Sequence, residues 1–322
     1  MRGLGHGAAA ALAMVALILP ATAQIDYPNR PVRIVVPFAP GGPTDVVMRS
    51  LADGLTARWG QTVIVENRPG AGTVLGNNLV AKAVPDGYTL LSVISAFVTS
   101  AAARVTLPYD PINDFVGVSM STISRWALVA YPKFPASNTA ELVAEAKRRT
   151  ESIDYGAPGI GGLGHMAGEL LQRAAGIKMQ FIPYGGSAVA WNDVMAGRVP
   201  VMFDVWHSVR PHVDGGSLKL IGAAGATRLA EYPNVPAIAE THPGFDVSGF
   251  QGIIAPRKIP PALLAKISAD VQAVVRSPEF SEKMKAIGGE AAASTPEELS
   301  AHIAREIAKW KEVAKAANIK ID

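Results

Sequence analysis

Two glycine-rich turns constrain the fold of this chain more than any other feature of its sequence. The first, residues 37–45 (PFAPGGPTD), follows the apolar segment VRIVV, and the second, residues 156–165 (GAPGIGGLGH), follows SIDY. Each turn leads into a segment with helical apolar spacing. A glycine turn between a strand and a helix is typical of α/β proteins, and its backbone N–H groups and the helix start can bind an anion. Two such turns predict two α/β units that close on an acidic small molecule.

Strands and helices alternate along the rest of the chain. Strands are predicted at residues 32–36, 61–65, 88–94, 125–130, 152–155, 179–183, 199–203, 218–223 and 247–256. Helices are predicted at residues 44–59, 77–83, 139–149, 165–175 and 189–196, and only helices follow residue 256. This order predicts two lobes between which the chain crosses twice. Residues 24–124 and 226–322 would form domain 1, and residues 125–225 would form domain 2.

The first residues have the pattern of a cleaved export signal. Arg2 precedes an apolar run over residues 8–19, and small residues at positions 21–23 provide a cleavage site. The run is shorter than the roughly 20 residues that a membrane-spanning helix needs. We therefore expect residues 1–23 to be a signal peptide and the mature protein to be soluble and exported.

The composition excludes several classes of protein. There is no cysteine, and hence neither a disulfide framework nor thiolate chemistry, and the formal net charge of +3 comes without a basic block that would bind nucleic acid. The six histidines are scattered without metal-site spacing. No G-x-S-x-G motif is found, and no nucleophile stands beside a base. We therefore predict a protein that is not an enzyme and that carries no metal or cofactor.

Each glycine turn has more than one interpretation. The first either binds an anion through backbone amides and Thr44, or is a plain turn whose helix Thr44 or Asp45 caps. The second contains a formal G-x-G-x-x-G, residues 159–164, but no acidic residue ends the next strand to hold a ribose, and an export signal argues against a nicotinamide cofactor. A carboxylate cradle that opens the helix at His165 fits better, with the imidazole donating to the anion.

Several other residues would contact the part of the ligand beyond its carboxylate. Asp204, at a strand end, either accepts from an amine or hydroxyl of the ligand or caps a helix. Trp126 and Trp206 are either core residues or ligand contacts. If Asp204 faces the cleft, an amino or hydroxy acid is favoured. A lining of Phe38, Phe97 and Trp206 would instead admit an aromatic acid.

The combined motifs resemble the Bug proteins, the extracytoplasmic solute receptors of tripartite tricarboxylate transport systems. The segments that carry the resemblance span the mature chain: YPNRPVRIVVPFAPGGPTD, VENRPGAGTVLGNN, PDGYTLL, LPYDPINDF, YGAPGIGGLGH, AGRVPVMFD, LKLIGAAGATR, YPNVPAIAE and GIIAP. The resemblance implies a type II periplasmic binding protein fold, with two doubly wound α/β lobes around a central ligand cleft (a Venus flytrap). It also implies that backbone amides and ordered water hold a ligand carboxylate.

The family's binding positions can be carried onto this chain residue by residue. In domain 1 they correspond to Phe38, Gly41, Gly42, Thr44 and Asp45, with hydroxyls added by Ser95 and Thr99 in the loop after the third strand. In domain 2 they correspond to Gly159, Gly161, Gly162, His165, Tyr184, Gly186 and Asp204. Gly185 replaces a common lysine, and Phe250-Gln251 replaces a common tryptophan. Because these departures fall near the site, no relative's specificity is transferred.

We therefore expect a monomeric periplasmic receptor that captures a small mono- or dicarboxylate and delivers it to the permease subunits of a tripartite tricarboxylate transporter. Nucleic acid is not an expected partner. A ligand-sensing partner of a membrane sensor kinase is the alternative that uses the same fold. A secreted hydrolase or isomerase of organic acids is the alternative from another class, and it would need a catalytic base in the cleft.

Overall fold

The computed structural model describes residues 26–321, so the predicted signal peptide lies outside the described residues. The strands are β1 (Val32–Val36), β2 (Val63–Asn67), β3 (Thr89–Ile94), β4 (Phe115–Ala130), β5 (Ile153–Pro158), β6 (Met179–Tyr184), β7 (Val201–Val205), β8 (Lys219–Ala223), β9 (Ser248–Pro256) and β10 (Glu290–Ala291). The α-helices are α1 (Pro43–Trp59), α2 (Val74–Ala81), α3 (Ser95–Ala103), α4 (Thr139–Arg148), α5 (Leu163–Ala175), α6 (Ser187–Met195), α7 (Trp206–Asp214), α8 (Pro261–Val275), α9 (Pro278–Ala286) and α10 (Pro296–Ala316). None of these helices is both long and apolar enough to cross a membrane.

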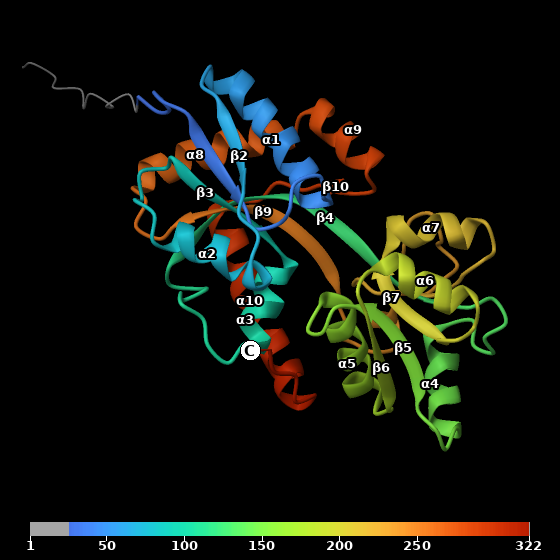
Figure 1. Ribbon diagram of the computed structural model, residues 1–322. Helices are drawn as coiled ribbons and strands as arrows, with labels where there is room; N and C mark the ends of the chain where they lie inside the picture. The colour runs from blue at the N-terminus through green and yellow to red at the C-terminus, as the bar shows by residue number, and fades with distance from the viewer. Residues whose placement is uncertain (1–25, 322) are drawn as a thin grey trace, which may run out of the picture.

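The strands form a mixed sheet in the order β2-β1-β3-β9-β4-β7-β5-β6, with β8 and β10 paired to β4. Strands β1, β2 and β3 are parallel, as are β5, β6 and β7, whereas β9 runs antiparallel to β3 and β4. Figure 1 shows two bodies that β4 and β9 connect. We call the body built on β1, β2, β3, β9 and the first part of β4 lobe 1, and the body built on β5, β6, β7, β8 and the last part of β4 lobe 2.

One strand, β4, belongs to both lobes. Its residues up to Arg125 pair with β9, and from Trp126 onward it pairs with β7. The return crossing lies beside it, because Ala224 N donates to Trp126 O and Val247 N donates to Ala224 O. The prediction of a new strand beginning at Arg125 is therefore wrong. The strand begins ten residues earlier and passes unbroken from one lobe into the other.

Each lobe has helices on both faces of its sheet, as doubly wound units require. In lobe 1, α1, α8 and α9 bury apolar residues on one face, and α2, α3 and α10 do so on the other. In lobe 2, α4 and α5 cover one face, and α6 and α7 cover the other. Helices α3 and α10 also contact α5, so the lobes touch beside the strands that join them.

Three helices can be compared directly with the secondary structure that their sequences indicate. The sequence Thr295-Pro296-Glu297-Glu298 has the pattern of a capping box, and α10 begins with one, because Thr295 Oγ1 accepts from Glu298 N and Glu298 accepts from Thr295 N. The segment after β3 is not a loop but helix α3, and α7 was missed altogether. Helix α7 contains Pro211, a residue that normally ends a helix. Burial against neighbouring elements holds both segments in helical form.

Candidate functional site

A cavity of about 240 Å³ lies between the lobes, where β4 and β9 join them. Lobe 1 contributes the end of β3 and the start of α3, and lobe 2 contributes the starts of α5 and α7. The lining residues are Ile94, Ser95, Ala96, Thr99, Ser124, Trp126, Gly162, Leu163, Val205, Gly249, Phe250 and Gln251. None of these residues carries a charged side chain. An anion held here would be neutralised by backbone N–H groups and helix starts.

The glycine turn of lobe 2 brings the start of α5 to this cavity. Gly159 and Gly161 have positive φ values of 68° and 71°, which only glycine adopts at no steric cost. Gly159 N donates to Tyr184 O and ties the turn to β6. Gly162 is the N-cap of α5 and has no side chain to satisfy the first N–H groups of the helix. These donors are available to a ligand.

His165 braces the turn from inside the protein. Its Nδ1 accepts a hydrogen bond from Gly161 N at 3.0 Å, and its ring stacks on Phe181 with centroids 3.8 Å apart. Burial lowers the pKa of the imidazole to about 4, so the ring is neutral near pH 7. The ring nitrogen nearest the turn is therefore an acceptor that positions the turn. This corrects the expectation that the ring donates to an anion from that side.

Acidification is expected to destabilise the protein through His165. Because the folded pKa is about 4 and the unfolded pKa about 6.5, the stabilising effect is complete above pH 6.5 and is lost as pH falls toward 4. At pH 5 the loss amounts to about 2 kcal/mol. Urea unfolding of wild type and His165→Gln between pH 7 and 5 measures it. The wild type should lose more stability than the variant, and parallel pH profiles would contradict the assignment.

The glycine turn of lobe 1 has the same arrangement, but a charged side chain holds it in place. Gly41 has a φ of 82°, Gly42 is the N-cap of α1, and Gly41 N donates to Asp45 Oδ2 at 2.9 Å. Gly41 and Asp45 thus stand in the same relation as Gly161 and His165. Asp45 also accepts from Arg49 and from Asn67 Nδ2, and the guanidinium of Arg49 lowers the pKa of Asp45 to about 2. The carboxylate of Asp45 therefore positions the turn.

The first turn is not part of the lining of the cavity in this arrangement of the lobes. It follows β1, which runs parallel to β3, so both strands end at the same edge of the sheet. Thr44 lies buried in the first turn of α1, and Phe38 packs at the edge of the lobe 1 core. Closure of the lobes would be needed to bring this turn onto a ligand in the cavity. The ligand-binding roles of Phe38, Gly41, Gly42 and Thr44 stay predictions.

Of the residues predicted to bind a ligand, the structure brings Ser95, Thr99 and Gly162 to the cavity. Ser95 is the first residue of α3, and its hydroxyl accepts from Phe250 N at 3.0 Å, which ties α3 to β9. Thr99 stands one turn further along the same helix. Gly159, Gly161 and His165 lie behind Gly162 and shape the turn. The predicted hydroxyl pair therefore comes from a helix start, where the sequence suggested a loop.

Three predicted residues of lobe 2 lie outside the lining. The Tyr184 hydroxyl donates to Asp193, and burial raises its pKa to about 12. Gly186 is the N-cap of α6 and is half-buried. Asp204 is buried, and its oxygens accept from Trp191 Nε1 and from Val205 N, both at 2.7 Å. Burial raises the pKa of Asp204.

These positions bear on both expectations about specificity, which stay predictions. Asp204 does not line the cavity, so it gives no reason to favour an amino acid. Phe97 and Trp206 are buried in the core, where Phe97 packs on Tyr109 and Trp206 packs on Tyr232. They supply no aromatic lining.

Most residues on the hinge side of the cavity were not indicated by the sequence. Ser124 and Gly249 sit opposite each other on β4 and β9, and Gln251 lies two residues along β9. A Cβ at Gly249 would lie 2.2 Å from Ser124 Oγ and 3.0 Å from Trp126 Nε1, so a side chain there would displace the Ser124 hydroxyl. Two sequence features pointed to this wall of the cavity. Phe250-Gln251 stands where family members commonly have a tryptophan, and Trp126 lies beside the crossing between the lobes.

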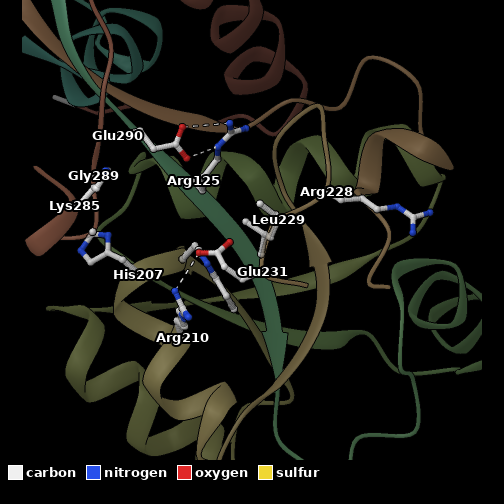
Figure 2. A pocket seen from close by; sticks show the side chains of 12 residues that line it. Arg125, His207, Arg210, Arg228, Leu229, Glu231, Lys285, Gly289 and Glu290 are labelled. Atoms are coloured by element: carbon white, nitrogen blue, oxygen red, sulfur yellow. Dashed lines mark hydrogen bonds and ion pairs between the residues drawn. The ribbon is translucent and has the colours of Figure 1, made fainter. Parts of the chain in front are cut away.

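A second cavity, of about 330 Å³, lies across β4 from the first, because Arg125 lines it while its neighbours Ser124 and Trp126 line the other. Figure 2 shows Arg125 directed at Glu290 and Arg210 directed at Glu231. The cationic side chains of this cavity are all paired with carboxylates: Arg125–Glu290, Arg210–Glu231, Arg228–Glu240 and Lys285–Glu282. Their charge is already neutralised, which makes this cavity a poor anion site.

The residues described by the structure include no group of three or more histidine, aspartate or glutamate side chains that could hold a metal ion. The candidate site is therefore the uncharged cavity at the hinge. Two α/β lobes joined by crossing strands, with a cavity between them and helix starts directed at it, define the class of two-lobed solute-binding proteins.

Comparisons with known proteins narrow this class to one family. Residues 47–319 match the tripartite tricarboxylate transporter family receptor model. BugT of Bordetella pertussis is 32% identical over 313 residues, which cover 96% of each chain. The solved periplasmic binding protein BugD is 34% identical with a TM-score of 0.71, over 91% of this chain and 99% of BugD. An R. palustris protein, Rpa4515, solved with adipate, is 31% identical with a TM-score of 0.75, over 92% of this chain and 99% of that one.

The chain belongs to the Bug family of tripartite tricarboxylate transporter receptors. The predicted family and the predicted periplasmic binding protein fold are both confirmed. The proteins of this family are solute-binding receptors.

Proposed function

We propose that this protein is a periplasmic receptor that binds a small carboxylate between its lobes and delivers it to the permease of a tripartite tricarboxylate transporter. Membership of the family and the adipate held by Rpa4515 support the ligand class. The location and the permease partner follow from the same family and from the export signal predicted over residues 1–23.

The observation that carries the proposal is the distribution of helix caps. Helices α1, α3, α5, α6 and α7 each follow the carboxyl end of a parallel strand, and none has a side-chain cap. Of the other helices, α4, α9 and α10 are capped by the side chains of Asn138, Ser277 and Thr295, whereas α2 and α8 have no side-chain cap but do not start at the carboxyl end of a parallel strand. The first N–H groups of the uncapped helices need acceptors. A carboxylate supplies them, and the starts of α3 and α5 lie at the cavity itself.

Two side chains hold these backbone donors in place when no ligand is bound. Asp45 and His165 each fix the turn before a helix by accepting from a glycine amide four residues earlier. The amides that follow are therefore pre-organised, which lowers the entropy lost on binding. Closure brings the lobe 1 turn toward the lobe 2 turn, and a carboxylate favours the closed form because only that form contacts both.

A panel of carboxylic acids is expected to raise the melting temperature of the purified protein. At a concentration of one hundred times Kd, a ligand adds about 2.7 kcal/mol of stability. For a protein of this size that corresponds to a rise in Tm of several degrees, roughly 2–4 °C per kcal/mol. Primary amides of the same carbon skeletons are the matched uncharged controls. A shift with a neutral sugar and with no acid would contradict the carboxylate assignment.

A further inference from the structure

The lobes meet a second time in the cavity that lies across β4 from the candidate site. There the ring of His207, from lobe 2, lies on the backbone of Gly288, from lobe 1. The ion pair Arg125–Glu290 lies in the same cavity. We propose that this second contact opposes closure of the lobes and thereby weakens ligand binding. The inference rests on the proposed function, because it assumes that closure brings the lobe 1 turn to the ligand.

The imidazole of His207 is packed directly against the backbone of lobe 1. His207 is the second residue of α7, and Gly288 lies between α9 and β10. A Cβ at Gly288 would lie 2.1 Å from both Cβ and Cγ of His207, so the imidazole side chain takes the space that another side chain would need. Gly289 N donates to Met284 O at 2.9 Å and ties this backbone to α9. A shift of α7 by about 1 Å would therefore either lose much of the contact or cause a clash.

Arg125 connects the two lobes beside this ring. Its Nε donates to Glu290 Oε1 at 3.0 Å, and its Nη1 donates to Thr227 Oγ1 at 3.4 Å. Glu290 belongs to β10 of lobe 1, and Thr227 follows β8 in the segment whose Leu229 packs in the core of lobe 2. Figure 2 shows Arg125 and His207 among the residues of this cavity. Both side chains of the ion pair are partly exposed, so we expect the pair to contribute less than the ring.

The second contact is coupled to the candidate site through the start of α7. Val205 lines the candidate site, and the next two residues, Trp206 and His207, line the cavity on the other face of β4. A rotation of lobe 2 that moves its glycine turn toward the lobe 1 turn therefore also moves His207 relative to Gly288. Because the ring is packed against backbone, this movement costs free energy, which favours the open form. The contact is one ring and one ion pair, so it shifts the equilibrium without preventing closure.

The ligand-free protein provides the first test. The chain contains no cysteine, so Asp53→Cys on α1 and Asn192→Cys on α6 place one dye on an exposed position of each lobe. Single-molecule energy transfer should show a ratio of closed to open molecules about tenfold higher when His207→Ala is added. His212→Ala is the matched control, because His212 lies in the same helix and its ring packs on Trp191 of lobe 2. Equal distributions in the two histidine variants would overturn the inference.

Affinity for carboxylates provides the second test. Butanoate, succinate, glutarate and adipate are titrated by calorimetry into each protein. His207→Ala should bind these acids up to about tenfold more tightly than wild type, and Glu290→Gln about threefold more tightly, because the closed form becomes more populated. Glu282→Gln removes an ion pair with Lys285 inside α9 and should leave affinity unchanged. Unchanged or weaker binding by His207→Ala would overturn the inference. Failure of all four acids to bind would count against the proposed function, and the energy-transfer result would still decide the inference.

Discussion

Replacement of Gly162 by alanine is expected to weaken carboxylate binding about 100-fold, because it displaces the start of α5. A Cβ at this position would lie 2.7 Å from Pro158 O and 3.3 Å from Gly159 O. Neither backbone atom can move freely, because Pro158 ends β5 beside β6 and Gly159 N donates to Tyr184 O. The turn must therefore shift, at a cost in stability of about 3 kcal/mol.

The equivalent residue of lobe 1 supplies the control. Gly42 is also an N-cap with an extended backbone, but the nearest atom to its Cβ would be Ala39 O at 3.8 Å. Gly42→Ala should cost less than about 1 kcal/mol, the usual loss at an N-cap, and should bind ligand more tightly than Gly162→Ala. Urea unfolding and calorimetry with the best acid measure both effects. Equal losses in the two variants would mean that steric contact at Gly162 is not the cause.

The sequence predicts the architecture well because its local signals agree with the tertiary fold. Glycine turns, apolar strands and the Thr295 capping box each identify an element that the structure contains. Prediction from the sequence fails where tertiary packing overrides the preference of a segment for one type of secondary structure. Residues 95–103 (SAFVTSAAA) lack a clear apolar period and become α3 because they are buried against α10 and α5. The first ten residues of β4 mix glycine and serine with apolar residues, so their strand pattern is weak.

The candidate site is harder to predict, because it depends on the direction of each side chain. The sequence places Asp204 at a strand end, yet only the structure shows its carboxylate turned to Trp191 and to Val205 N. Residues 124–126 illustrate the same point, since alternate residues of one strand line two different cavities. The residues that complete the cavity meet only when β4 and β9, which are far apart in sequence, pair with each other.

Replacement of Asp45 by alanine is expected to destabilise the protein by about 3 kcal/mol and to weaken carboxylate binding about tenfold. The carboxylate is buried and accepts from Gly41 N, from Arg49 and from Asn67. Its pKa is about 2 when folded and about 3.8 when unfolded, so its charged form contributes stability above pH 3.8 that is lost as pH falls toward 2. That difference alone is worth about 2 kcal/mol. Truncation adds the cost of leaving Gly41 N and the Asn67 amide without an acceptor.

Asp45→Ala is expected to lose both stability and affinity, and a variant in the same helix supplies the control. Asp53 is an exposed carboxylate of α1, so Asp53→Ala should change stability by less than about 0.5 kcal/mol and leave affinity unchanged. Asp45→Asn retains one acceptor oxygen for Gly41 N and should fall between wild type and Asp45→Ala in both measurements. Normal affinity in a destabilised Asp45→Ala protein would show that the lobe 1 turn does not contact the ligand. The carboxylate would then be held by α3 and α5 alone.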